Sequence, residues 1–308
     1  MPLVPADARP DSWVDASPMT LRPWLRLMRL DRPIGVALLL LPCFFGLALG
    51  AAAQGRGFGS WHDLKLSGLF IAGAIVMRGA GCTYNDIVDR DIDAMVARTR
   101  GRPIPSGAVS LQGAWIFAAL QCVAGLAVLL QFNRFSIFLG AASLVLVALY
   151  PFMKRITWWP QAWLGLTFNW GALLGFSAET SHLAPPAFLL YAGCFFWTLG
   201  YDTIYAHQDS DDDALIGVKS TARLFEETSS RWIDGFYALA LGFLALALVV
   251  ATRHLWTALL LIPTGIHFIW QARLLDVGNT ERCLKLFRAN RDTGLLTAAA
   301  IIAASYFA

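Results

Sequence analysis

Charge is what this chain has least of. Only 15% of its 308 residues are charged, whereas 57% are apolar, and soluble domains carry about 25% charge. The mean hydropathy is +0.55. The few charges are bunched, which leaves apolar stretches of about 20 residues, long enough to cross a bilayer as helices. These shortages exclude an ordinary soluble domain and predict an all-α membrane protein.

Metal-type cysteine spacing, a leader sequence and linkers are also lacking. Four of the five cysteines fall in apolar stretches, where a thiol packs as a small residue. The first 20 residues contain three aspartates and no apolar core, so they resemble neither a signal peptide nor an Arg-rich transit peptide. We therefore expect a bacterial cell inner membrane rather than a mitochondrial one. The domain organisation predicted is a mobile cytoplasmic tail at 1–20 and a single integral membrane domain at 21–308.

Nine apolar stretches are present, and they predict nine transmembrane helices in a bundle around a central cavity. They cover residues 33–54, 66–84, 113–132, 135–153, 158–178, 185–205, 232–252, 254–273 and 292–308. Numbering the connections from the N-terminal tail as zero, the even connections contain 19 of the 24 Lys and Arg residues, and the odd ones contain four. Positive charge collects on the cytoplasmic side of membranes. The N-terminus is therefore predicted to be cytoplasmic.

Two aspartate clusters follow the second and the sixth apolar stretches. The first reads Asn85-Asp86-x-x-Asp89-x-x-x-Asp93, and the second reads Asp202-x-x-Tyr205-x-x-x-Asp209-x-x-x-Asp213. The predicted topology places both clusters on the cytoplasmic side. Carboxylates beside a bilayer are costly to leave unpaired. Together the clusters predict bound divalent cations and, through the cations, a bound anion such as a diphosphate.

The spacing within each cluster places its acids on one face, if each helix continues past its last tyrosine. At about 100° per residue, the first cluster spans roughly 60° and the second about 40°. Carboxylates that share a face repel one another unless a cation lies between them. Mg²⁺ fits because it takes oxygen ligands and bridges carboxylates to phosphates. Solvated acids, or acids paired with nearby arginines, are the alternative, and the occurrence of two such clusters on one side disfavours it.

Three further polar residues need an explanation. Arg78 lies on the face of Asn85, about 10 Å deeper in the bilayer, and a buried guanidinium needs an anion. It either pairs with an aspartate of another helix or binds a substrate carboxylate. Lys154 follows the fourth stretch on the cytoplasmic side. It is either a positive residue that anchors the helix there or a residue that contacts the diphosphate. Asn169, inside the fifth stretch, predicts a hydrogen bond between helices rather than a ligand.

At these residues the chain resembles a known family. The paired clusters resemble the two aspartate motifs of the UbiA intramembrane prenyltransferases, and Tyr150-x-x-x-Lys154 is similar to a third element. Within that family, the segments 31–35, 77–86 and 201–222 resemble the 4-hydroxybenzoate polyprenyltransferases of ubiquinone synthesis. The resemblance extends from about residue 24 to the end, and only the acidic tail lies outside it.

The resemblance implies a nine-helix bundle whose cavity opens to lipid. It implies transfer of a polyprenyl group from a polyprenyl diphosphate to the 3-position of 4-hydroxybenzoate. The partners implied are these two substrates and the lipid bilayer, and no nucleic acid. Mg²⁺ would be held by Asp86, Asp89, Asp93, Asp209 and Asp213, and the diphosphate by Asn85, Lys154, Arg155, Arg102 and Lys219. Arg78 and Asp202 would bind the aromatic acceptor, and Asp202 and Lys154 would be catalytic.

Three alternatives remain open or are excluded on specific grounds. Another aromatic acceptor, such as homogentisate, dihydroxynaphthoate, haem or chlorophyllide, is disfavoured by the segments 77–86 and 201–222. A CDP-alcohol phosphotransferase would need Asp-Gly-x-x-Ala-Arg, which occurs at neither cluster. A cation-coupled transporter would have acidic residues near the midplane of broken helices, whereas here the acids follow the helix ends.

Overall fold

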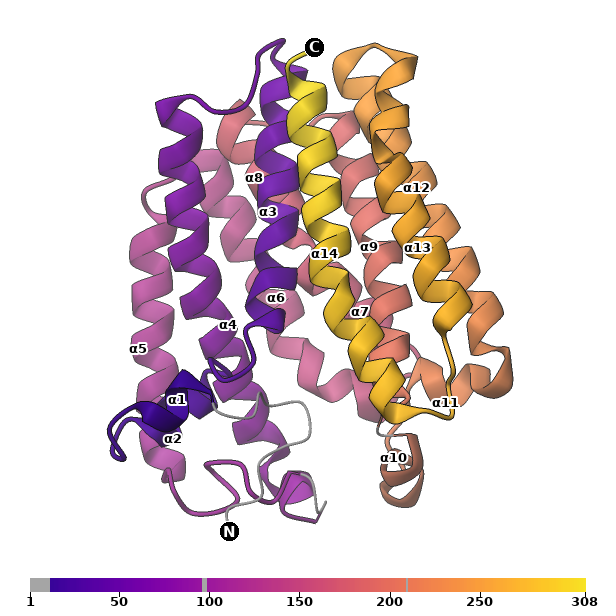
Figure 1. Cartoon of the computed structure of the whole chain (residues 1–308). Helices are drawn as coiled ribbons and strands as arrows, with labels where there is room; N and C mark the ends of the chain where they lie inside the picture. The colour runs from indigo at the N-terminus through magenta and orange to yellow at the C-terminus, as the bar shows by residue number, and fades with distance from the viewer. Residues whose placement is uncertain (1–11, 96–98, 209) are drawn as a thin grey trace. The chain divides into compact units, whose positions relative to one another are not determined.

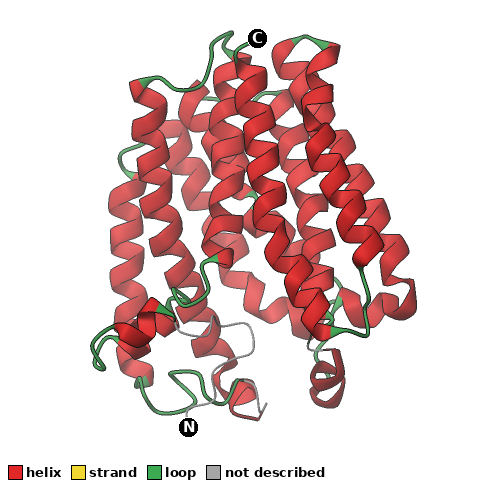
Figure 2. Ribbon diagram, viewed as in Figure 1, coloured by secondary structure: helices red, strands yellow, loops and turns green. Residues whose placement is uncertain are grey.

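The structure is a computed structural model that describes residues 12–95, 99–208 and 210–308 (Figures 1 and 2). Within these ranges all regular structure is helical and no strand occurs. Contacts between residues divide the chain into two compact units. The first unit comprises residues 1–37 and 69–131, and the second comprises residues 38–68 and 132–308.

The first unit consists of short helices packed against parts of two long ones. It contains α1 (Trp13–Ala16), α2 (Arg22–Leu27), most of α4 (Trp61–Met95) and α5 (Leu111–Leu129). Its core joins Leu27 of α2 to Ile87 of α4 and Ala114 of α5. In the described part of the predicted tail, Asp15 of α1 accepts a hydrogen bond from Arg26 Nη2 at 2.7 Å.

The second unit contains the remaining helices. They are α3 (Ile34–Ala53), α6 (Arg134–Ile156), α7 (Pro160–Phe168), α8 (Trp170–Thr180), α9 (Pro185–Ala206), α10 (Ser210–Ile216), α11 (Thr221–Phe225), η1 (Glu226–Thr228), α12 (Ser229–Thr252), η2 (Leu255–Leu261), α13 (Ile262–Leu274) and α14 (Thr280–Ser305). The first residues of α3 belong to the first unit, and the first turns of α4 belong to the second. Helix α9 lies at the centre of this unit, since it packs against α7, α8, α12 and α14.

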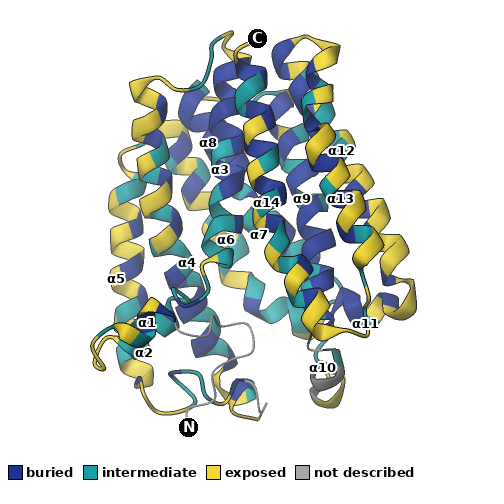
Figure 3. Cartoon of the chain, viewed as in Figure 1, coloured by how far each residue is buried: buried dark blue, intermediate teal, exposed yellow. Residues whose placement is uncertain are grey.

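Glycines allow α3 and α8 to touch backbone to backbone. A Cβ on Gly46 would lie 2.2 Å from the carbonyl oxygen of Ala172, and one on Gly175 would lie 2.2 Å from that of Cys43. Small residues at such contacts are typical of helix pairs in membranes. Most residues of α3 and α8 are buried (Figure 3).

Each of the nine predicted apolar stretches contains a helix, with two differences in detail. The fifth stretch is divided at Asn169 into α7 and α8, and the eighth begins as the 3₁₀ helix η2. The Asn169 side-chain amide donates to Thr198 Oγ1 at 2.7 Å, which confirms the predicted hydrogen bond between helices. Among the described residues, six helical segments are long and apolar enough to cross a membrane.

Apolar side chains also cover outward-facing surfaces. Leu120 and Val123 of α5 are 61% and 65% exposed, and Phe138 and Val145 of α6 are 77% and 63% exposed. Exposed apolar side chains of this kind are unfavourable in water and are expected of helices that face lipid.

Candidate functional site

The first aspartate cluster lies on α4, which continues past Tyr84 to Met95 as predicted. Asp86 and Asp89 are fully buried and Asp93 is 5% exposed. Asn85 Nδ2 donates a hydrogen bond to Asp89 Oδ2 at 3.0 Å, one turn further along the helix. Buried carboxylates are stable only when paired.

Arginines of the same unit supply that pairing. Arg29 Nη2 lies 2.6 Å from Asp86 Oδ1, and Arg102 Nη1 lies 3.4 Å from the same oxygen and 2.6 Å from Asp93 Oδ2. The second oxygen of Asp86, Oδ2, is buried without a hydrogen-bond partner among the described residues. Arg102, predicted to bind diphosphate, therefore lies beside the predicted metal ligands.

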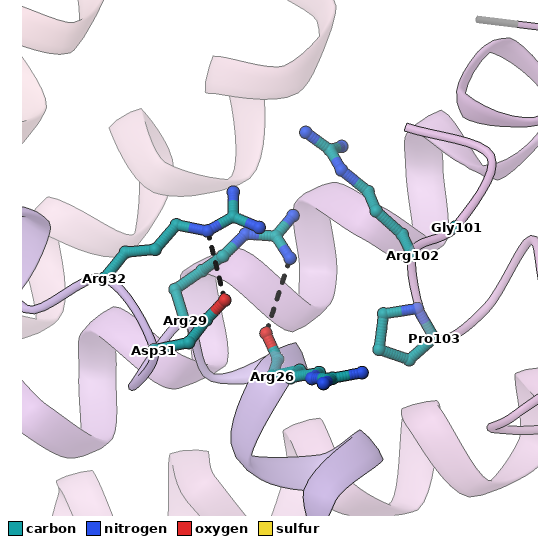
Figure 4. Close-up of a pocket in the computed structure, with 7 residues that line it drawn as sticks. All are labelled: Arg26, Arg29, Asp31, Arg32, Gly101, Arg102 and Pro103. Carbon is teal, nitrogen blue, oxygen red and sulfur yellow. Dashed lines mark hydrogen bonds and ion pairs between the residues drawn. The ribbon is translucent and has the colours of Figure 1, made fainter. Parts of the chain in front are cut away.

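A pocket beside this cluster is lined mainly by arginine. Its lining consists of Arg26, Arg29, Asp31, Arg32, Gly101, Arg102 and Pro103. In Figure 4 the guanidinium groups of Arg29 and Arg32 approach from the side opposite Arg102, and Arg32 pairs with Asp31 at 3.2 Å. Positive charge from two distant segments thus gathers beside buried carboxylates, an arrangement suited to an anion that arrives with cations.

Sequence reasoning missed Arg29, which it counted only as a cytoplasmic charge. Arg29 adopts a left-handed backbone with φ 59°, rare for a residue with a side chain. Its Nη1 donates to the carbonyl oxygen of Arg26, and its Nη2 reaches Asp86. The available signal was the spacing of Arg26, Arg29 and Arg32 just before the first apolar stretch, but nothing in that spacing identifies Asp86 as the partner.

Arg78 lies on α4, seven residues before Asn85. A Cβ on Gly35 would lie 2.9 Å from Arg78 Nε and 3.0 Å from Nη2. The glycine of the Asp31–Gly35 segment therefore leaves room for the guanidinium.

The second aspartate cluster begins on α9 but does not continue as one helix. Helix α9 ends at Ala206, and the separate short helix α10 begins at Ser210, so the expected single face through Asp202, Asp209 and Asp213 is wrong. The break begins at His207 and Gln208, which form a turn; the Gln208 N–H donates to the Tyr205 carbonyl oxygen at 3.1 Å, three residues back, in place of a helical bond. Asp209 lies outside the described residues, and Asp202 and Asp213 are both half-buried.

The basic residues of the second unit that were predicted to bind diphosphate lie at or near the end of α6. Lys154 and Arg155 occupy its last turn. The backbone N–H of Lys219 donates to the Lys154 carbonyl oxygen at 3.0 Å, and the Lys219 ammonium donates to the Ile156 carbonyl oxygen at 3.1 Å. The segment after α10 is therefore attached to α6, and Lys219 and Lys154 are brought side by side.

The donor set suits a hard divalent cation, although it does not form a complete site. Among the described residues no group of three or more His, Cys, Asp or Glu side chains is arranged to hold a metal ion. The buried Asp86 Oδ2 is available as an oxygen ligand, and carboxylate oxygens are the ligands that Mg²⁺ prefers. Arg29 and Arg102 supply positive charge to this cluster.

Comparison with known proteins identifies the family. The model of the UbiA prenyltransferase family matches residues 39–298. The chain belongs to this family. It is 49% identical to the mitochondrial 4-hydroxybenzoate polyprenyltransferase of Bos taurus over 92% of this chain and 75% of that protein. The corresponding enzyme of Homo sapiens is 48% identical over 94% of this chain and 77% of that protein. For Arabidopsis thaliana the identity is 44%, over 94% of this chain and 71% of that protein.

Solved UbiA structures share the fold. A UbiA homologue from Aeropyrum pernix K1 superimposes with a TM-score of 0.71 at 25% identity, over 87% of this chain and 97% of that one. A homologue from Archaeoglobus fulgidus, solved with GPP and Mg²⁺, gives a TM-score of 0.67 at 18% identity, over 91% of this chain and 99% of that one. The chain therefore has the UbiA fold.

The relatives correct one expectation. We expected a bacterial inner membrane because the first residues resemble no targeting leader, but these relatives, at 44–49% identity, are mitochondrial enzymes. The expected compartment is therefore wrong. Membrane-spanning helices bury the same apolar surface in either membrane, so the features that predicted the fold do not distinguish the two.

Proposed function

We propose that this UbiA-family chain transfers a polyprenyl group from an allylic polyprenyl diphosphate to the 3-position of 4-hydroxybenzoate, in ubiquinone synthesis. The observation that carries the proposal is 44–49% identity, over more than 90% of the chain, to curated 4-hydroxybenzoate polyprenyltransferases. The allylic C–O bond breaks and diphosphate leaves. The ring carbon then bonds to the allylic carbon, and the ring proton is lost.

Divalent cations, Mg²⁺ in the first instance, are part of this proposal. Asp86, Asp89 and Asp93 would hold them in the first unit, and Asp209 and Asp213 in the second. The buried Asp86 Oδ2 without a partner among the described residues supports the assignment. Bound cations would stabilise negative charge on the departing diphosphate. Asp209 lies outside the described residues, and the pairing of the two clusters around the cations is part of the proposal.

Five polar or positively charged side chains of the chain are assigned to the diphosphate. These residues are Asn85 and Arg102 in the first unit and Lys154, Arg155 and Lys219 in the second. Arg102 already contacts Asp86 and Asp93, and Lys219 is held against the end of α6. Lys154 would bind the leaving group directly and stabilise its charge as the C–O bond breaks.

The acceptor is assigned to Arg78 and Asp202. The Arg78 guanidinium, which lies against Gly35, would bind the benzoate carboxylate in a bidentate manner. Asp202, half-buried on α9, would orient the phenol and take up its proton. A more electron-rich ring then attacks the allylic carbon, and surrounding apolar side chains exclude water that would compete for it.

The architecture proposed is one membrane domain at 21–308 with nine transmembrane helices and a cytoplasmic N-terminus. Helices in all nine predicted stretches support the count. The concentration of 19 Lys and Arg residues in even-numbered connections supports the orientation.

The test uses membranes that contain the full chain, with radiolabelled 4-hydroxybenzoate, geranyl diphosphate and Mg²⁺. We expect prenylated product, and we expect it to disappear with EDTA and in Asp86→Asn and Asp209→Asn variants. Asp91→Asn is the matched control on α4, because Asp91 is 83% exposed and should retain activity. No product from the wild-type chain beside active control membranes would overturn the function. Product that survives EDTA and both variants would overturn the metal site.

A further inference from the structure

A network of buried polar side chains joins α9, α12, α13 and α14 in the second unit. Its members are Trp197, Tyr237, Gln271, Asn290 and Thr293, none more than 3% exposed. Tyr237 Oη donates to Gln271 Oε1 at 3.0 Å, and Gln271 Nε2 donates to Thr293 Oγ1 at 2.8 Å. Polar groups in an apolar interior are retained only when satisfied, so such a network fixes the helices in one register.

Asn290 of α14 is the hub of this network. Its amide nitrogen donates to Gln271 Oε1 at 2.8 Å and to the Leu286 carbonyl oxygen at 3.0 Å. Its amide oxygen accepts from Trp197 Nε1 at 2.8 Å and from Gln271 Nε2 at 3.5 Å. Both donors and both acceptor positions of this side chain are therefore used. The bond to Trp197 is the network's direct connection from α14 to α9.

Trp197 links Asn290 to Tyr201, the residue that precedes Asp202 on α9. Its ring meets the Tyr201 ring edge-on, with centroids 5.4 Å apart, and Asp202 is the next residue. Phe287, almost one turn before Asn290 on α14, contacts Tyr201 at 6.0 Å and Tyr205 at 4.4 Å between ring centroids. Side chains of α14 thus contact α9 at Trp197, Tyr201 and Tyr205, on both sides of Asp202 in the sequence.

We propose that Asn290 is a positioning residue for the prenyl transfer: by fixing Trp197 it sets Tyr201 and the direction from which Asp202 meets the acceptor. The inference rests on the proposed function, which assigns Asp202 to the aromatic acceptor. Asn290 touches neither substrate. Its substitution should therefore reduce kcat while leaving the KM for the polyprenyl diphosphate unchanged.

The test compares Asn290→Leu, Trp197→Phe and the double variant, in the assay described above. Asn290→Leu leaves the buried indole N–H unpaired, and we expect kcat to fall about tenfold, the change that corresponds to about 1.4 kcal/mol. Trp197→Phe removes that N–H and should reduce kcat about fivefold, by loosening the contact to Tyr201. Because both substitutions act through one contact, kcat of the double variant should be reduced by no more than about tenfold.

Thr297→Val is the matched control for a purely structural effect. Thr297 is 2% exposed, and its hydroxyl is hydrogen-bonded to Thr264 of α13 at 3.2 Å and donates to the Thr293 carbonyl oxygen of its own helix at 2.9 Å. We expect it to lower the unfolding temperature while leaving kcat unchanged. Multiplicative losses in the double variant, or equal kcat for Asn290→Leu and Thr297→Val, would overturn the inference. If Asn290→Leu does not fold, Trp197→Phe alone decides, since an unchanged kcat contradicts it. Failure of the proposed function would instead leave the wild-type chain inactive.

Discussion

Gly35 is constrained by the residue opposite it, since a Cβ at this position would lie 2.9 Å from Arg78 Nε. Gly35→Ala should therefore displace the guanidinium and raise the KM for 4-hydroxybenzoate about tenfold, the cost of disturbing one charged hydrogen-bonding group. Its effect on the KM for the polyprenyl diphosphate should be small. Steady-state kinetics with each substrate varied in turn checks this.

Gly68→Ala provides the control, because a Cβ at Gly68 of α4 meets nothing within 4 Å. An unchanged KM for 4-hydroxybenzoate in Gly35→Ala would remove Arg78 from the acceptor site.

Arg29 pairs with Asp86, the carboxylate that is proposed to hold a metal ion. With Arg29→Gln, the fully buried Asp86 retains Arg102 at 3.4 Å but loses its partner at 2.6 Å. Breaking a buried pair costs about 3 kcal/mol or more, so in EDTA this variant should unfold at a lower temperature than the wild type. Mg²⁺ should narrow the gap, because a bound cation restores the missing charge. Thermal unfolding in detergent, with EDTA or Mg²⁺, measures both.

Arg90→Gln is the comparison for Arg29→Gln, since Arg90 is 44% exposed and pairs with an exposed aspartate; surface pairs contribute little. A Mg²⁺ effect of equal size in all three proteins would mean that Arg29 and the cation do not share Asp86.

At the scale of elements, the connection between α3 and α4 is held by an ion-pair cluster that the sequence did not reveal. Arg56 Nη2 contacts both Asp63 Oδ1, at 2.8 Å, and Glu179 Oε2. The connection is further tied down where Asp63 Oδ2 accepts from the backbone N–H groups of Gly59 and Ser60. Glu179 is 123 residues from Arg56 in sequence, and no periodic pattern reports a contact at that separation.

The same cluster makes stability depend on pH. Burial, and then the charge of Asp63, raise the pKa of Glu179 from 4.5 to about 7, against the opposing effect of Arg56. Nε2 of the neighbouring His62 lies 3.8 Å from Glu179 Oε2. Because the folded-state pKa is the higher one, protonated Glu179 favours the fold. That stability is complete below pH 4.5 and is lost as the pH rises to about 7.

Glu179→Gln should remove the contribution of Glu179 to the pH dependence of stability. Between pH 4.5 and 8 the unfolding temperature should fall in the wild type and should fall less steeply in the variant. The corresponding difference in the free energy of unfolding is up to about 3 kcal/mol. Glu227→Gln, at an exposed position, should keep the wild-type slope. A wild-type slope in Glu179→Gln would assign the titration to another group.

How far the sequence predicts the molecule depends on the range of the interaction. Helices follow from apolar runs, a local property, so helices occur in all nine stretches. The break between α9 and α10 begins at His207 and Gln208, and the spacing of the aspartates alone does not predict it. The Arg29–Asp86 pair, 57 residues apart, and the Asn290 network depend on packing between distant helices. They become visible only in three dimensions.

The membrane topology is the property of the whole molecule that labelling can decide. Nine crossings from a cytoplasmic N-terminus place the connections after α4 and α13 on the cytoplasmic side, and those after α5 and α12 on the other. Single cysteines at Ser106, Gln131, Arg253 and Gly278, all exposed, would be introduced into a chain without its own cysteines. A membrane-impermeant maleimide applied to vesicles of known orientation should label Ser106→Cys and Gly278→Cys from the cytoplasmic face, and Gln131→Cys and Arg253→Cys from the opposite face. Labelling of Gly278→Cys together with Arg253→Cys would mean that η2 and α13 do not cross, and the count of nine would be wrong. Labelling of Ser106→Cys from the opposite face would instead reverse the orientation, against the excess of Lys and Arg in the even connections.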